Sequence, residues 1–231
     1  MGREKLFCFP YAGGSSTLYE GGFYGLKDVY DVISVDYSGH GTKFGMPLNE
    51  TMDALVEEAC REVAGKLSRE EQYCLFGYSL GSLVAYEVAC CLRDSGFRAP
   101  RIMFLCSMTA PGRVPEDKWI HRLSDEDFLK EMVRNGGIDE ELAADPLLTQ
   151  MFLPIIRMDY RIYELYEGRT HGMLDAHALV MYSREDIDDR DIHGWDGAIK
   201  DVEYLCYPGG HFFIYDKYSE VVSEILKRRM R

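Results

Sequence analysis

The chain alternates between two kinds of hydrophobic pattern. Short runs of apolar, β-branched or aromatic residues, each bounded by turn residues, recur along its length. Runs of this kind are typical of strands buried on both faces of a sheet. The predicted strands cover Lys5–Pro10, Asp31–Tyr37, Gln72–Tyr78, Arg101–Ser107, His177–Ser183 and Val202–Pro208.

Between these runs, apolar residues recur at steps of three and four, which predicts amphipathic helices. The clearest examples run from Met52 to Leu67 and from Tyr218 to Leu226, and Ser82–Leu92 is also helix-like. Strands that alternate with helices predict an α/β fold, with a mostly parallel sheet covered on both faces by right-handed crossovers.

One long stretch breaks the alternation, because residues 109–171 contain no convincing strand pattern. Ser124 is a candidate N-cap for a helix closed by Gly136-Gly137, and a second helical run follows Pro146. We expect Pro154 to interrupt or kink that second run. The expected organisation is a core in two parts, residues 1–108 and 172–231, with a helical insertion at 109–171. This insertion, called the lid below, should cover the carboxyl edge of the sheet.

Composition and charge narrow the class of protein. The net charge of −13 disfavours nucleic acids and anionic membrane surfaces as partners. No apolar run approaches the ~18 residues of a membrane helix, and the first residues do not form a signal peptide. We therefore expect a soluble, cytoplasmic protein. Its seven cysteines show neither C-x-x-C pairs nor zinc spacing, so we expect no metal and no disulfide.

The strongest chemical signal is the pentapeptide Gly77-Tyr78-Ser79-Leu80-Gly81, which matches G-x-S-x-G. It directly follows a predicted strand and directly precedes a predicted helix. That context is typical of the nucleophile turn of the α/β-hydrolase fold, in which the serine is lifted into the site. Ser79 is therefore the candidate nucleophile.

A serine hydroxyl needs a base, and His211 is the best placed of the six histidines. It follows the last predicted strand in a glycine-rich loop, so it should reach the same sheet edge as Ser79. We interpret the other histidines as loop, lid or surface residues. The third member should be a carboxylate after the penultimate strand. Asp186 is favoured, and the alternatives, in order of preference, are Asp188, then Glu185 and Asp189.

A developing oxyanion needs backbone N–H donors. Leu80, which immediately follows the candidate nucleophile, offers one. The small residues of the loop after the first strand let the backbone approach a substrate closely, and Ala12 is our choice for the second donor.

Over nearly its whole length the chain resembles the type II thioesterases, the stand-alone editing enzymes of non-ribosomal peptide and polyketide synthesis. The resemblance rests on Phe9–Gly14, on Gly77–Gly81, on Pro208–Phe213 and on the lid stretch Leu153–Tyr160. It implies hydrolysis of thioesters on the phosphopantetheine arm of acyl or peptidyl carrier proteins, which are met transiently. It implies no cofactor of the enzyme's own, and we expect a monomer.

Several lid residues are candidates for substrate or partner contacts. Met132, Met151, Phe152 and Met158 either line an adaptable acyl channel or simply form the core of the lid. The basic residues Arg113, Lys118 and Arg122 are candidates for docking a carrier protein, although a solvated surface explains them equally well.

Two other functions fit the same residues. The chain could be a small-molecule esterase or an acyltransferase that uses the same three groups. It could also be a non-catalytic module that binds carrier proteins and retains the fold.

Overall fold

The computed structural model describes residues 2–112 and 114–229, so Arg113 lies outside the described residues. Its centre is a six-stranded sheet in the order β2-β1-β3-β4-β5-β6, and every pair of neighbouring strands is parallel. All six predicted strands are confirmed. Their bounds are Glu4–Phe9 (β1), Tyr30–Ser34 (β2), Tyr73–Tyr78 (β3), Ile102–Cys106 (β4), Leu174–Tyr182 (β5) and Ile199–Cys206 (β6).

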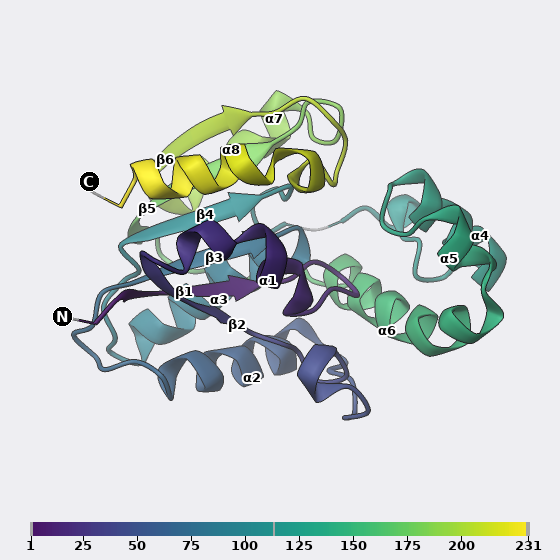
Figure 1. The fold of residues 1–231 in the computed structure, drawn as a ribbon, viewed down its shortest axis with the longest axis horizontal. Coiled ribbons are helices and arrows are strands. Elements are labelled where there is room, and N and C mark those ends of the chain that lie inside the picture. Colours follow the sequence, from purple (N-terminus) through teal and green to yellow (C-terminus); the bar gives the residue numbers. More distant parts are fainter. Residues whose placement is uncertain (1, 113, 230–231) are drawn as a thin grey trace.

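Helices cover both faces of the sheet (Figure 1). Alternate side chains of one strand therefore enter different cores: in β1, Phe7 and Phe9 pack with α2 and α3, whereas Leu6 and Cys8 pack with α1 and α8. Because each face is buried, the strands are apolar at nearly every position, which is why the sequence signal is continuous. These helices are α1 (Thr17–Gly22), α2 (Met52–Ala64), α3 (Leu80–Asp94) and α8 (Ile214–Lys227).

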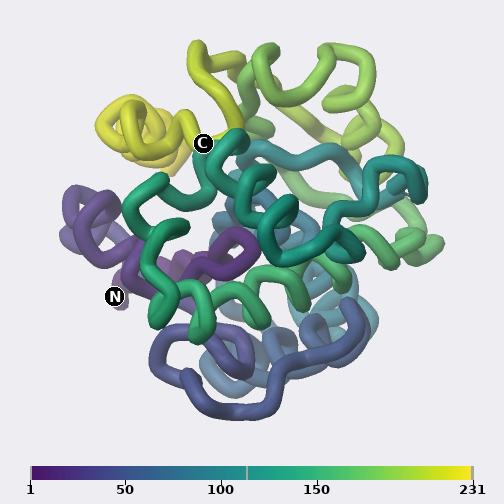
Figure 2. The backbone as a smooth tube through the Cα atoms, turned by 90° about the vertical axis from the view of Figure 1, so that its right-hand side faces the viewer, coloured from purple at the N-terminus to yellow at the C-terminus, as the bar shows by residue number. Residues whose placement is uncertain are grey.

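The lid lies between β4 and β5, beyond the carboxyl ends of the strands (Figures 1 and 2). Its described part contains a short 3-10 helix and three α-helices and no strand. Ser124 caps α4 as predicted, because its hydroxyl accepts the N–H of Asp127 at 3.2 Å. Phe128, Met132 and Leu153 form a small core within the lid. The elements are η3 (Glu116–Lys118), α4 (Asp125–Arg134), α5 (Glu140–Ala144) and α6 (Pro146–Glu164).

Helix α6 is not interrupted at Pro154, which lies inside it, so of the two predicted effects the interruption is wrong and the kink stays a prediction. Proline lacks the N–H that would bond four residues back, which costs about 3 kcal/mol in a helix interior. The residues on either side of it, Leu153 and Ile155, are both buried. Tertiary packing of α6 therefore outweighs the local signal.

The sequence pattern also missed three short helices, α1, α5 and α7 (Asp189–Ile192), which are too short to show a helical period. All seven cysteines are free thiols. Within residues 2–112 and 114–229, no helix has the length and apolar character to cross a bilayer. The same residues bring together no group of three or more histidine, cysteine or acidic side chains suited to a metal ion.

Candidate active site

Ser79 occupies the turn that joins β3 to α3, and its backbone is strained. Its φ is 52° and its ψ is −123°, a conformation that costs a non-glycine residue about 1–3 kcal/mol. The glycines on either side permit the turn because the chain passes very close to them. A Cβ on Gly77 would lie 2.3 Å from the carbonyl oxygen of Gly81, and a Cβ on Gly81 would lie 2.1 Å from that of Phe9. The motif is therefore required by packing as well as by the turn.

Replacing Gly81 by alanine should destabilise the protein severely. The new methyl group would overlap the backbone of β1, which cannot move aside by a change of rotamer as a side chain can. This overpacking should cost about 3 kcal/mol or more. In a domain of this size that corresponds to a fall in Tm of roughly 6–12 °C. Gly21→Ala in α1 is the matched control, because nothing lies within 4 Å of a Cβ there. Thermal denaturation of the two variants checks the prediction, and equal Tm values would contradict it.

Ser79, His211 and Asp186 form one hydrogen-bonded series. His211 Nε2 lies 2.9 Å from Ser79 Oγ, and His211 Nδ1 lies 2.8 Å from Asp186 Oδ2. Both distances are within the range that a nucleophile, its base and an orienting acid require. The imidazole and the carboxylate are only partly exposed, so water competes weakly for these bonds. The structure thus brings together the three residues that the sequence predicts, over separations of 132 and 25 positions.

The other candidate acids have different partners. Asp188 caps α7 by accepting the N–H of Arg190 at 2.8 Å, and Asp189 accepts the hydroxyl of Tyr182 at 2.6 Å. Glu185 accepts the N–H of Gly209 at 3.2 Å, in the loop that carries His211. Of the four carboxylates, Asp186 is the one that is hydrogen-bonded to the imidazole.

The backbone of His211 is held by two side chains that sequence reasoning missed. Its carbonyl accepts the hydroxyl of Tyr78 at 2.5 Å and that of Ser107 at 2.8 Å. Burial raises the pKa of Tyr78 far above its ordinary value, so this hydroxyl stays protonated and donates. Ser107 follows β4 and has a φ of 50°. No sequence pattern predicts a positive φ at this serine. The only signal for a role of Ser107 in holding His211 is its position at the end of a strand.

The two predicted oxyanion donors both lie at this edge of the sheet. Leu80 is the first residue of α3, and the first N–H groups of a helix have no partner within it. Ala12 lies in the loop after β1, whose base is held by the hydroxyls of Tyr19 and Tyr37. These donate to the carbonyls of Phe9 at 2.6 Å and of Pro10 at 3.1 Å. The donor roles of Leu80 and Ala12 stay predictions.

The lid touches this edge at two points. A Cβ on Gly137, just after α4, would lie 3.4 Å from the ring of Phe212, the neighbour of His211. A Cβ on Gly13, beside Ala12, would overlap the side chain of Ile156 in α6. The lid therefore contacts both the loop of the histidine and the loop of Ala12.

The four predicted acyl-contacting residues have different surroundings. Met132 is buried and, with Phe152, lines an apolar crevice of about 20 Å³ inside the lid, which has room for about one water molecule. Met151 is half exposed, whereas Met158 packs against the main core. Their role as an acyl channel stays a prediction.

A parallel sheet in this order, with a serine on a strained turn after β3 and a histidine after β6, defines the α/β-hydrolase class. Comparison with known proteins narrows the class to a family. Residues 4–228 match the thioesterase domain family, and the chain belongs to it. It is a hydrolase that acts on thioesters.

Individual relatives agree with the family. Thioesterase PikA5 from Streptomyces venezuelae is 29% identical over 96% of this chain and 79% of its own length. The crystal structure of ClbQ from the colibactin NRPS/PKS pathway superposes with a TM-score of 0.91 at 26% identity, covering 98% of this chain and 96% of ClbQ. The type II thioesterase BorB from the borrelidin biosynthetic cluster superposes with a TM-score of 0.86 at 25% identity, over 97% and 92% of the two chains. The resemblance to type II thioesterases seen in the sequence is confirmed by these matches.

Proposed function

We propose that this protein is an editing thioesterase that removes acyl or aminoacyl groups from the phosphopantetheine arm of carrier proteins. Ser79 acts as nucleophile, His211 as base and Asp186 as the orienting acid. The observation that carries the proposal is the continuous series of hydrogen bonds from Asp186 through His211 to Ser79 in a member of the thioesterase family.

The first half of the reaction transfers the acyl group to the enzyme. His211 Nε2 takes the proton of the Ser79 hydroxyl while the oxygen attacks the thioester carbonyl carbon. The resulting oxyanion accepts the N–H groups of Leu80 and Ala12. The carbon–sulfur bond then breaks, and the imidazolium returns its proton to the departing sulfur, so the arm leaves as a free thiol.

The second half releases the acid. A water molecule gives a proton to His211 and attacks the acyl-enzyme carbonyl, and collapse of the second oxyanion returns the proton to Ser79. Asp186 accepts the Nδ1–H of the imidazole throughout and stabilises its charged form. The reaction draws on no cofactor bound by this chain, because the phosphopantetheine is part of the substrate.

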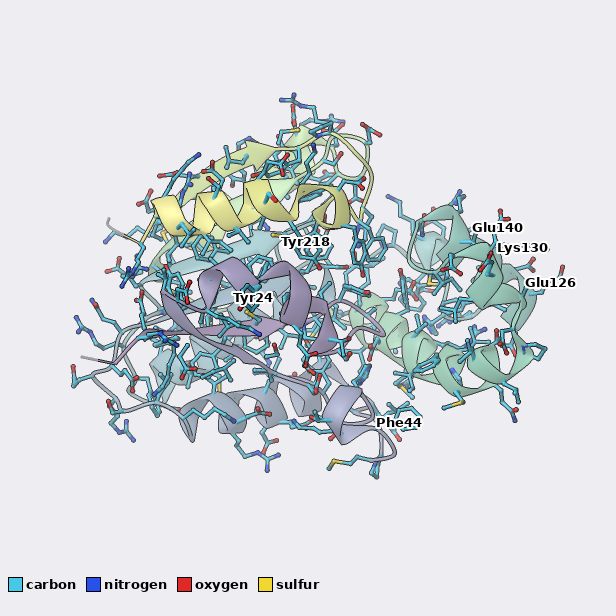
Figure 3. The ribbon with its side chains drawn as sticks, viewed as in Figure 1. Tyr24, Phe44, Glu126, Lys130, Glu140 and Tyr218 are labelled. Carbon is cyan, nitrogen blue, oxygen red and sulfur yellow. The ribbon has the colours of Figure 1, made fainter. Side chains whose placement is uncertain are left out.

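Carrier proteins are typically acidic, and so is this chain, so docking should be weak and local. Lys118 and Arg122 are the described basic candidates on the lid, and the Arg122 guanidinium stacks over the ring of Trp119 at 4.3 Å. The same guanidinium also lies 3.9 Å from the carboxylate of Glu116, and Lys130 on α4 is paired with Glu126 (Figure 3). The segment around Trp119, which carries both candidates, is the proposed contact. Docking there is transient, and the enzyme acts as a monomer.

The expected preference for carrier-bound thioesters gives a direct test. The same acyl group is offered on a carrier protein, on coenzyme A and as an oxygen ester, and the free acid is measured. The kcat/KM for the carrier thioester should exceed that for coenzyme A by roughly tenfold, about 1.4 kcal/mol of docking energy. The double variant Lys118→Glu, Arg122→Glu should remove this advantage and leave coenzyme A turnover unchanged.

Other outcomes identify the competing functions. Faster turnover of the oxygen ester would indicate an esterase, and transfer of the acyl group to an added alcohol or amine would indicate an acyltransferase. Binding of carrier protein without release of acid would indicate a non-catalytic module.

A further inference from the structure

A buried carboxylate of the lid contacts the loop that carries Ala12. Asp159 lies on α6, and its side chain is 2% exposed. Its Oδ2 accepts the backbone N–H of Gly13 at 2.7 Å and lies 2.8 Å from His40 Nε2. A buried carboxylate is expensive unless it is paired and hydrogen-bonded, so these two contacts fix its place. Asp159 thereby joins segments 146 and 119 residues away along the chain.

His40 is buried as well, and its ring nitrogens both face oxygen atoms. Nδ1 lies 3.2 Å from the carbonyl oxygen of Ser38, and Nε2 faces the carboxylate of Asp159. Two acceptors require two donors, which only the charged imidazolium provides. Burial alone would lower the pKa of His40, but the hydrogen bond and charge of Asp159 outweigh it and raise that pKa above its ordinary value. In the charged state of His40, its positive charge offsets that of the Asp159 carboxylate, so the pair adds little negative charge beside a developing oxyanion.

The loop of His40 is itself held firmly by the core. The carboxylate of Glu58 on α2 accepts the backbone N–H of Ser38 at 3.2 Å. It also accepts hydrogen bonds from the ammonium group of Lys43 and the side-chain amide of Asn49. His40 is thus a fixed point against which Asp159, and with it α6, is positioned.

The loop after β1 depends on the lid only at its centre. At its start, hydroxyls of the core donate to the carbonyls of Phe9 and Pro10. At its end, the backbone N–H of Ser16 donates to the carboxylate of Asp36 at 2.6 Å. Between these anchors, the N–H of Gly14 donates to the carbonyl of Tyr11 at 2.8 Å and closes a turn around Ala12 and Gly13. The further contacts at Gly13 come from α6, through Asp159 and Ile156. Because a peptide unit is planar, the turn bond of Gly14 and the bond of Asp159 to Gly13 N–H together orient the Ala12–Gly13 peptide. The direction of the Ala12 N–H then depends on the dihedral angles of Ala12 alone.

We propose that Asp159 is a positioning residue that couples the lid to the oxyanion hole. With α6 in place, Asp159 holds the Ala12–Gly13 peptide so that the Ala12 N–H can donate to the oxyanion. When α6 moves away, the loop loses this acceptor and the hole loses a donor. Attack on the thioester is thereby restricted to the state in which the lid is docked on the core. This inference rests on the proposed function, since it assumes that Ala12 donates to the oxyanion.

Helix α6 offers a matched control in Glu164, whose side chain is also 2% exposed. Its carboxylate accepts the backbone N–H groups of Ile120 at 2.8 Å and His121 at 3.1 Å and pairs with the His121 ring. These bonds brace the lid internally and do not reach the loop of Ala12. Loss of Glu164 therefore loosens the lid without withdrawing the acceptor of Gly13.

The test compares Asp159→Ala, Asp159→Asn and Glu164→Ala on a small acyl thioester, with hydrogen exchange of residues 10–16 measured alongside. Losing one oxyanion donor lowers kcat by about 10²–10³-fold, so losing its positioning should lower kcat by roughly 10–100-fold with little change in KM. Asp159→Asn should recover to within about fivefold of wild type, because its amide oxygen still accepts Gly13 N–H. Glu164→Ala should keep kcat within about threefold. Only Asp159→Ala should speed exchange in the loop.

Three results would overturn the coupling: a wild-type kcat for Asp159→Ala, equal losses of kcat in Asp159→Ala and Glu164→Ala, or unchanged exchange at residues 10–16. If Asp159→Ala does not fold, Asp159→Ser replaces it, because serine keeps a polar group in the cavity but is too short to reach Gly13. Failure of the proposed function would look different. In that case a Ser79→Ala enzyme would still hydrolyse the thioester.

Discussion

Replacing Ser79 by alanine should lower kcat/KM for thioester hydrolysis by at least about 10⁴-fold. The side-chain oxygen is the atom that bonds to the acyl carbon, and no other described hydroxyl is hydrogen-bonded to His211 Nε2. The residual activity of the variant would come from direct attack by water on the bound thioester, assisted by the backbone N–H donors. The measurement is steady-state release of the free thiol, together with labelling by a fluorophosphonate, which should mark the native protein and not the variant.

Folding should survive this change, because alanine bears the same positive φ as serine at the turn. Ser79→Gly is the informative partner, since glycine relieves a strain worth about 1–3 kcal/mol. We expect an inactive protein with a Tm equal to or above that of the native enzyme. A Ser79→Ala variant with more than a tenth of native turnover would show that another group attacks the thioester.

The elements that the sequence predicted well are those whose signal is local. Each strand of a sheet buried on both faces is a short apolar run, and the turn at Ser79 is recognisable from a motif of five consecutive residues. Gly77 is a glycine because its neighbour in space, the start of α3, belongs to the same strand–turn–helix unit. The position of His211 after the last strand follows from strand order alone. Such features need no knowledge of distant contacts.

Features that depend on distant contacts could not be predicted in the same way. Asp186 and Asp188 are two residues apart in an acidic turn, and only the fold shows that one faces the imidazole while the other caps α7. His40 looked like an ordinary loop histidine because its partner, Asp159, is 119 residues away. Pro154 is a local signal for the end of a helix, and the packing of α6 overrides it. In each case the deciding interaction is tertiary.

The lid's place in the molecule follows from the same buried polar contacts. Asp159 and Glu164, five residues apart on α6, are both almost fully buried carboxylates with different partners. Asp159 binds Gly13 of the core, whereas Glu164 binds Ile120, which lies before α4 in the lid. The first determines where α6 sits on the sheet edge, and the second determines the shape of the lid. Apolar packing alone would tolerate sliding of α6, whereas these hydrogen bonds define one register.

Replacing Asp186 by asparagine should lower kcat by roughly 10³–10⁴-fold while leaving the fold intact. The asparagine amide can donate to His211 Nδ1, which would leave the ring proton on Nε2, facing Ser79. In that tautomer the imidazole cannot accept the serine proton, and the positive charge that develops on it has no carboxylate nearby. Asp188→Asn is the matched control: asparagine caps a helix as well as aspartate does, so kcat should stay within about threefold of native. Single-turnover measurement of acyl-enzyme formation separates the two variants, because the loss should already appear in the first step. If Asp186→Asn acylates at the native rate and Asp188→Asn does not, the orienting carboxylate is Asp188, and the loop after β5 must rearrange when substrate binds.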